Sequence, residues 1–190
     1  MVLETKRLIL RPFVENDVGD AFEYLKKPTV NCFACMKTES VEQAKRAVIE
    51  RAKDSEYYFA IVLKDSGRVI GEISAMPESP APDGDRAKLD TYSPCWMLNT
   101  DYHGQGYAYE AARAFFNYLF NDKGARRIYA YTEDNNTASQ RLCEKLGMRR
   151  EGLFREFVTF VNDEAGNPIY ENTYQYAILK KEWNGGEEQN

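Results

Sequence analysis

Two glycines precede a predicted helix in the segment YHGQGYAYEA, at positions 102–111. Gly104 and Gly106 can adopt backbone angles that other residues avoid, and the first N–H groups of a helix attract phosphate. The segment therefore has the composition of a phosphate-binding turn. It matches no complete nucleotide motif, because Tyr109 replaces the third glycine of G-x-G-x-x-G and no Gly-Lys-Ser/Thr follows. Taken alone, it favours a plain connection between a strand and a helix.

The cysteines give no clear metal or redox site. Cys32 and Cys35 form a C-x-x-C within what reads as a connecting loop, whereas Cys95 and Cys143 stand far from each other in the sequence. A structural zinc site needs a second ligand pair, and a thioredoxin-like pair needs to lie just after a strand and to open a helix. We therefore expect no metal and only buried or incidental thiols.

Composition indicates one folded domain. The chain has 190 residues, of which 43% are hydrophobic, enough for one sizeable core and few for two domains. A formal net charge of −5 argues against a general nucleic-acid-binding protein, which would be basic on at least one face. No signal peptide is recognisable, and no apolar run approaches the roughly 18 residues that span a membrane. We expect a cytoplasmic protein with no direct nucleic-acid or membrane partner.

Hydrophobic periodicity predicts the elements that position the turn. Their order is β-α-α-β-β-β-α-β-α-β-β, which indicates an α+β fold with a mixed sheet, helices on both faces and one central parallel crossover. We expect a single domain over 1–181 and a frayed tail over 182–190. The predicted strands are 7–13, 56–64, 68–76, 93–99, 126–133, 154–162 and 167–181, and the predicted helices are 18–25, 40–52, 108–120 and 135–146.

A second segment changes the interpretation of the turn. After the next predicted strand comes DNNTASQRLCEKLGMRREG, beginning at position 134. Together, H-G-Q-G-Y-A at 103–108 and N-x-x-S…E-K-L-G-M at 136–148 resemble the acetyl-CoA site of the GNAT superfamily of acyltransferases, and the element order matches along nearly the whole chain. The segments LETKRLILRPF and NTASQRL resemble most the branch with the ribosomal-protein N-terminal (alanine/serine) acetyltransferases. That branch also holds many enzymes acting on small amines.

The resemblance implies which residues contact acetyl-CoA. The turn would hold the pyrophosphate, and a backbone N–H near Met97 or Leu98 would polarise the thioester carbonyl. His103 stands where the family has Gln or Arg, so contact with phosphate or solvent suits it better than a role as base. Asn136 could merely cap its helix, and Ser139 could face water. The predicted contacts are Trp96, Met97, Leu98, Asn99, His103, Gly104, Gln105, Gly106, Tyr107, Ala108, Asn136 and Ser139.

The resemblance also implies direct attack by a neutral amine, which needs a base and can use an acid for the leaving thiolate. In many members a tyrosine seven residues after the position of Asn136 acts as this acid. Cys143 stands there in this chain, so we predict Ser139 as the acid. A base known at the position of Tyr131 is also missing. We predict Glu156 as the base, with Glu72 as the alternative, although either carboxylate could simply be a solubilising side chain.

The predicted function is transfer of an acetyl group from acetyl-CoA to a primary amine. A protein α-amine, with a pKa of about 7.7–8.0 against about 10.4 for lysine, needs less help to become neutral and is therefore favoured. A small amine such as a polyamine or an antibiotic is the alternative acceptor, and a non-catalytic CoA-binding module is a further one. Exposed strand edges also make a homodimer plausible.

Overall fold

A computed structural model describes residues 1–79 and 89–185, and the elements in this part of the chain follow the expected order. The short strand β1 and the early start of β7 are additional to the prediction. So are four 3-10 turns, η1 (Glu15–Asp17), η2 (Asn31–Met36), η3 (Thr100–Tyr102) and η4 (Lys180–Glu182). The helices are α1 (Val18–Leu25), α2 (Val41–Ala52), α3 (Tyr107–Asn121) and α4 (Thr137–Lys145). The strands are β1 (Leu3–Glu4), β2 (Leu8–Arg11), β3 (Tyr58–Leu63), β4 (Val69–Glu78), β5 (Thr91–Leu98), β6 (Arg127–Glu133), β7 (Arg149–Asn162) and β8 (Pro168–Leu179).

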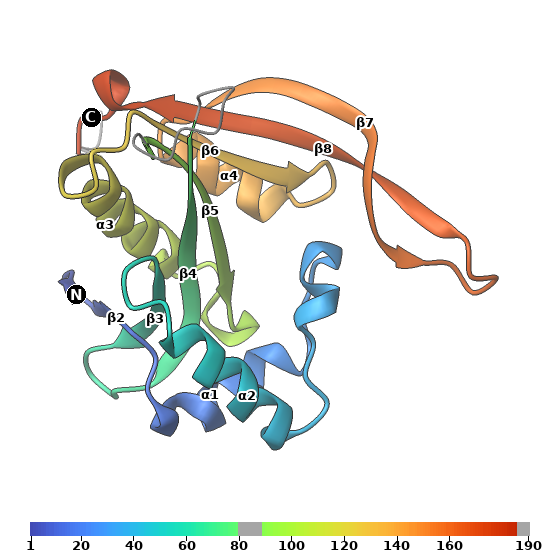
Figure 1. Ribbon diagram of the computed structural model, residues 1–190, viewed down its shortest axis with the longest axis horizontal. Coiled ribbons are helices and arrows are strands. Elements are labelled where there is room, and N and C mark those ends of the chain that lie inside the picture. Colours follow the sequence, from blue (N-terminus) through green and yellow to red (C-terminus); the bar gives the residue numbers. More distant parts are fainter. Residues whose placement is uncertain (80–88, 186–190) are drawn as a thin grey trace.

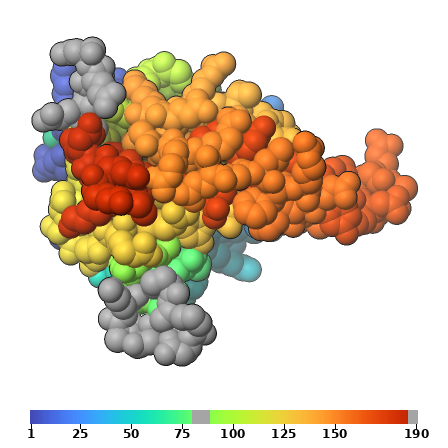
Figure 2. All heavy atoms as spheres, turned by 90° about the horizontal axis from the view of Figure 1, so that it is seen from above, coloured from blue at the N-terminus to red at the C-terminus, as the bar shows by residue number. Residues whose placement is uncertain are grey.

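The strands form one sheet in the order β1-β2-β3-β4-β5-β6-β8-β7, in which only β5 and β6 are parallel. Helices α3 and α4 lie on one side of the sheet, and α1 and α2 lie on the other (Figure 1). This arrangement confirms the predicted α+β class. The end of the β7–β8 hairpin projects from the body as an arm (Figure 2). None of the helices in the described ranges is long and apolar enough to cross a membrane.

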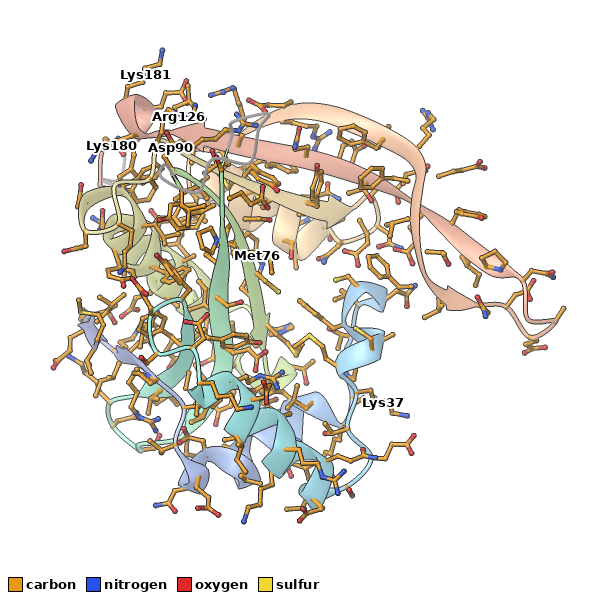
Figure 3. The ribbon with its side chains drawn as sticks, viewed as in Figure 1. Lys37, Met76, Asp90, Arg126, Lys180 and Lys181 are labelled. Atoms are coloured by element: carbon orange, nitrogen blue, oxygen red, sulfur yellow. The ribbon has the colours of Figure 1, made fainter. Side chains whose placement is uncertain are left out.

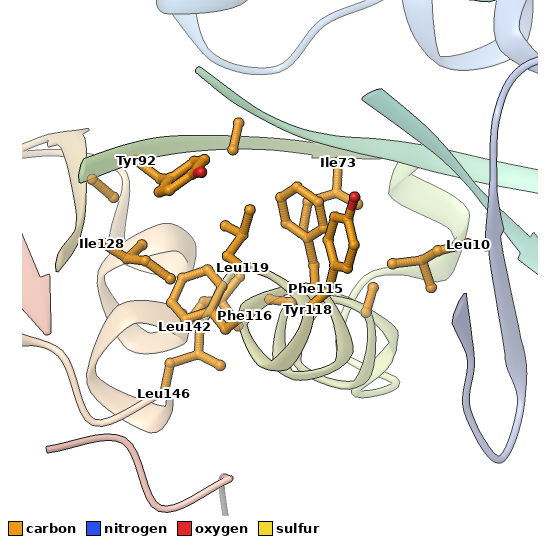
Figure 4. Packing of buried hydrophobic residues seen from close by; sticks show 14 of the residues in the cluster. Leu10, Ile73, Tyr92, Phe115, Phe116, Tyr118, Leu119, Ile128, Leu142 and Leu146 are labelled. Atoms are coloured by element: carbon orange, nitrogen blue, oxygen red, sulfur yellow. The ribbon is translucent and has the colours of Figure 1, made fainter. Parts of the chain in front are cut away.

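Helix α3 forms the centre of the larger core. Its apolar residues recur every three or four positions, so that Phe115, Phe116 and Leu119 are fully buried against the sheet. Figure 4 shows them packed beneath Ile73 of β4 and Tyr92 of β5. This core fixes the axis of α3, and therefore the position of the glycine turn at its start.

The chain after β8 packs against the far end of the same helix. Trp183 has its ring centroid 5.7 Å from that of Phe116 and 5.6 Å from that of Phe120. Its indole N–H donates to Asn117 Oδ1 at 2.8 Å. The expectation of a tail frayed from residue 182 is therefore wrong for Trp183, because aromatic burial holds it in place. Residues 186–190 lie outside the described residues, and so do residues 80–88, which fall between the predicted strands 68–76 and 93–99.

A buried ion pair ties the helices of the other face to the sheet. Glu72 of β4 is 3% exposed and accepts two hydrogen bonds from the Arg51 guanidinium of α2, at 2.9 and 3.1 Å. It also accepts from the hydroxyls of Tyr24 at 2.9 Å and Tyr58 at 2.6 Å. Four donors therefore surround this carboxylate. That environment makes Glu72 a structural residue and argues against it as the alternative base.

Replacing Arg51 by methionine should lower the free energy of unfolding by about 3–5 kcal/mol, because Glu72 would keep a buried charge without its cation. Arg46→Met on the same helix is the matched control, since Arg46 and Glu42 form an exposed pair at 4.0 Å. That change should cost less than about 0.5 kcal/mol. Urea unfolding of both variants measures the difference, and equal costs would contradict a structural role for the buried pair.

The two parallel strands are joined only at their beginnings. Their pairing covers Thr91↔Arg127 and Tyr92↔Ile128 and then ends. Directly before the strands, Arg126 Nε contacts Asp90 Oδ2 at 3.2 Å, and the Arg126 N–H donates to the Asp90 carbonyl at 2.7 Å. Figure 3 labels this pair close together at one end of the sheet. Beyond it, β5 stays with β4 and β6 stays with β8, so the two strands diverge.

Pro94 explains why the pairing stops. The N–H of Asn99 donates to Ile70 of β4, so alternate residues of β5 direct their backbone nitrogens to the other edge, towards β6. Pro94 is the first of these after Tyr92, and it has no N–H to continue the ladder. The N–H groups of Trp96 and Leu98 therefore face a gap without a strand partner among the described residues.

Candidate acetyl-CoA site

A cavity of about 450 Å³ lies between the end of β5 and the beginnings of α3 and α4. All predicted acetyl-CoA contacts except Asn99 and Gln105 line it. Asn99 accepts from the N–H of Asp101, and the Gln105 side chain donates to the Asp101 carbonyl, so both shape the connecting loop instead. The lining residues are Thr29, Val30, Phe33, Trp96, Met97, Leu98, Tyr102, His103, Gly104, Gly106, Tyr107, Ala108, Asn136, Ala138, Ser139, Arg141 and Leu142.

The glycine turn has the geometry of an anion site. Gly104 and Gly106 have φ angles of 72° and 81°, in the left-handed region that favours glycine. Gly106 is the N-cap of α3 and provides no side-chain cap, so the first N–H groups of the helix remain available. These groups and the positive end of the helix dipole suit a pyrophosphate.

Arg7 of the β1–β2 connection holds this turn in place. Its Nη1 donates to the Gln105 carbonyl at 3.0 Å, and its guanidinium lies 4.2 Å from the centre of the Tyr107 ring. Its Nε also pairs with Glu110 of α3 at 2.6 Å. Arg7 therefore braces the turn from the other end of the sequence, a separation that no local motif reveals.

His103 takes a structural place in the turn. Its Nε2 lies 3.0 Å from the Leu98 carbonyl oxygen, which can only accept a hydrogen bond, so Nε2 carries the proton. The side chain is otherwise exposed. It links the end of β5 to the turn, which agrees with the preference for a role other than base.

Ser139 lies where the two predicted halves of the site meet. The Trp96 indole N–H of β5 donates to Ser139 Oγ at 3.2 Å. Asn136 caps α4 by accepting from the N–H of Ser139 at 3.1 Å, and it still lines the cavity. The capping role considered for Asn136 is therefore present, and it presents the Ser139 hydroxyl towards β5.

Glu156, the predicted base, lies elsewhere. It is exposed on β7, has a φ of 48°, and donates its backbone N–H to Asn172 Oδ1 at 3.0 Å. A register shift between Phe154 and Val158 contains it, which breaks the strand alternation behind the prediction. Since Glu156 does not line the cavity, the geometry gives this prediction no support.

Cys143 and Cys32 are held as protonated thiols. Burial raises the pKa of Cys143 to about 12. Burial and then the neighbouring Glu133 carboxylate raise the pKa of Cys32 far above its usual range. Within residues 1–79 and 89–185, no group of three or more His, Cys, Asp or Glu side chains could hold a metal ion.

The cavity also has walls that the sequence did not indicate. Thr29, Val30 and Phe33 come from the segment between α1 and α2, where the C-x-x-C of Cys32 and Cys35 gave no indication of an acetyl-CoA contact. Leu142 lies three residues after Ser139 on the same face of α4, so helical spacing from that predicted contact could have identified it. Arg141 follows from neither Asn136 nor Ser139 by this spacing.

Comparison with known proteins agrees with this geometry. The sequence profile described as an acetyltransferase (GNAT) domain matches residues 7–149. The chain belongs to the GNAT acetyltransferase family. It is 33% identical over 184 residues to YnaD of Bacillus subtilis (strain 168), described as an uncharacterized N-acetyltransferase, covering 97% of this chain and 100% of that protein. It is therefore an acetyl-CoA-dependent N-acetyltransferase.

Solved structures of GNAT acetyltransferases share the fold. A GNAT-family acetyltransferase from Bacillus anthracis superposes with a TM-score of 0.80 at 28% identity, covering 96% of this chain and 100% of that one. The ribosomal-protein-S5-alanine acetyltransferase from Vibrio fischeri superposes with a TM-score of 0.72 at 17% identity, covering 96% and 98%. The second likeness shows the fold alone.

The acetyltransferase also has a tight contact behind the end of β5 that lines its cavity. A Cβ atom on Gly71 of β4 would lie 2.3 Å from the Met97 carbonyl oxygen and 2.9 Å from Leu98 Cα. Gly71→Ala should therefore displace the end of β5 and lower CoA affinity by about tenfold or more, since overpacking typically costs about 1–3 kcal/mol. Calorimetric titration with CoA measures the loss.

Gly19→Ala on α1 is the matched control, because its added Cβ would meet nothing within 4 Å. It should leave the CoA affinity unchanged. A Gly71→Ala protein with normal thermal stability and normal CoA affinity would contradict the assignment of this strand end to the site.

Proposed function

We propose that this acetyltransferase acetylates the α-amine of protein N-termini, with Ser139 protonating the CoA thiolate as it leaves. The bond from the Trp96 indole to Ser139 Oγ carries the second part of the proposal. Trp96 can only donate, so the Ser139 hydroxyl keeps its own proton for another acceptor. Cys143 stands where many family members have the tyrosine that acts as the acid, and Cys143 is buried. Ser139 is the α4 hydroxyl that lines the cavity.

The diverging strands support the binding part of the mechanism. Acetyl-CoA supplies a thioester whose carbonyl carbon accepts the neutral amine and whose thiolate departs. The N–H groups of Trp96 and Leu98 face the gap, where they can pair with the amides of the pantetheine arm. Of the two predicted oxyanion donors, Leu98 N–H has this direction, whereas Met97 N–H points to β4. Leu98 would then stabilise the negative charge that develops on the thioester oxygen.

The lining of the cavity supports the choice of acceptor. No carboxylate of the described residues lines it, so the site offers no carboxylate base beside the predicted thioester position, and His103 is engaged with the Leu98 carbonyl. At pH 7.4 roughly a quarter of an α-amine with pKa about 7.8 is already neutral, against about 0.1% of a lysine amine. An acceptor that loses its proton to water therefore suits this site. The shared fold with a ribosomal-protein-S5-alanine acetyltransferase is consistent with such an acceptor.

Changing Ser139 to alanine should lower kcat about 100-fold, as expected for loss of a general acid, while the KM for acetyl-CoA changes little. Thr137→Ala, which removes a hydroxyl from the same helical turn, is the control and should keep normal kcat. Initial rates of CoA release over several acetyl-CoA concentrations separate the two constants. An unchanged kcat in Ser139→Ala would refute the proposed acid.

The pH profile tests the acceptor. With a peptide of free N-terminus, kcat/KM should rise with pH and level off near pH 8, because the neutral fraction of an α-amine saturates there. The control is a peptide whose N-terminus is blocked by a formyl group and whose remaining amine is an internal lysine. It should not be acetylated. Acetylation of that lysine at a comparable rate, with kcat/KM still rising towards pH 10, would contradict the preference for α-amines.

A further inference from the structure

A second polar cluster lies beside the acetyl-CoA site, on the sheet face away from α3. Glu133 ends β6 and is 5% exposed, and Glu171 of β8 is 8% exposed. Thr173 of β8 pairs with Glu133 in the sheet register. The turn η2 covers this recess, because the Cys32 N–H donates to Glu133 at 3.1 Å and Asn31 Nδ2 donates to Glu171 Oε1 at 2.6 Å.

The recess has acceptors left over. Glu171 Oε2 and Thr173 Oγ1 are buried, and neither has a hydrogen-bond partner among the described residues. Neither glutamate forms an ion pair with a lysine or arginine of that part of the chain. Buried carboxylate oxygens without a donor are costly and therefore rare. A ligand with a positive charge and several N–H groups, an ammonium or a guanidinium, would complete this arrangement.

The recess lies next to the acetyl-CoA site. The register that pairs Tyr92 with Ile128 places Glu133 level with Met97, across the gap between β5 and β6. A cavity of about 350 Å³, lined by Thr29–Asn31 and 135–138, adjoins the recess through Asn31. It shares Thr29, Val30 and Asn136 with the acetyl-CoA cavity. A molecule whose amine reaches the thioester can therefore also place a second group near the glutamates.

We propose that Glu133 and Glu171 bind a second positively charged group of the acceptor, separate from the amine that is acetylated. In a peptide this group would be a lysine or arginine side chain near the N-terminus, and in a small acceptor it would be a second ammonium. The inference rests on the proposed function for its peptide form.

The charge state of Glu133 explains why the bound group is not the reacting amine. Although burial raises the pKa of Glu133, hydrogen bonds from Cys32 and Asn136 outweigh it and hold the pKa below its usual value. Such a carboxylate stabilises a bound ammonium in its charged form and accepts its proton poorly. Attack needs a neutral amine, so the recess is suited to recognition and not to proton removal.

The test compares two peptides that differ only at their second residue, lysine or norleucine, and both start with serine. The wild-type enzyme should show kcat/KM about 10- to 100-fold higher for the lysine peptide, as for a hydrogen bond to a buried charge. Glu133→Gln and Glu171→Gln should each reduce this ratio to within about threefold of unity. Glu164→Gln, in the exposed turn after β7, is the control and should keep the full ratio.

Because the ratio is taken within each variant, a general loss of activity leaves it unchanged, and calorimetry with CoA shows that each variant is folded. If the wild type shows no lysine preference, or if both Gln variants keep it, the proposed binding of a second cation by the glutamates is wrong. Either result leaves the proposal of N-terminal acetylation unaffected. Spermidine and butylamine form a second pair. Turnover of spermidine alone, lost in the Gln variants, would support the recess and reject the peptide function. Turnover of no acceptor would reject both.

Discussion

The divergence of β5 and β6 is the constraint on which this molecule depends. Backbone N–H and C=O groups inside a sheet normally find strand partners, and leaving them unpaired is costly. Here Asp90 and Arg126 fix the beginnings of both strands, and Pro94 removes the next donor of the ladder. Each strand remains fully paired on its outer edge. The fold can therefore keep a gap open at its centre without losing the sheet, and an extended ligand with amides can fill it.

Because side chains alternate along a strand, those that border the gap point to two opposite faces of the sheet. On β5, the side chains of Trp96 and Leu98 turn towards α3 and α4, where the glycine turn and Ser139 lie. Met97 turns the other way, towards α1 and α2. On β6, Glu133 turns to that same second face, under η2. One opening can thus receive the acyl donor from one face and the acceptor from the other, with the reacting atoms meeting between them.

Features with local causes were predictable from the sequence. The helix predicted over 40–52 begins at Ser40, whose side chain caps it by accepting from the Gln43 N–H. The positive φ angles of Gly104 and Gly106 agree with the glycine turn predicted there. Features that depend on distant residues were not. The ion pair of Arg7 with Glu110 joins positions more than a hundred residues apart. The predicted role of Glu156 assumed regular alternation along β7, and the register shifts of that strand remove this assumption.

Among the residues that the structure describes, no carboxylate lines the acetyl-CoA cavity, which changes how the charges of this enzyme are best understood. A thiol has a pKa of about 8.5 and an α-amine one of about 7.7–8.0, so near neutral pH both proton transfers are close to balanced. Catalysis then depends mainly on holding the two reactants in a productive geometry, which alone can supply about 7–11 kcal/mol of the barrier. Anchoring the acceptor at a second point serves that purpose. The buried glutamates are therefore more useful to this enzyme as an anchor for the acceptor than as a base.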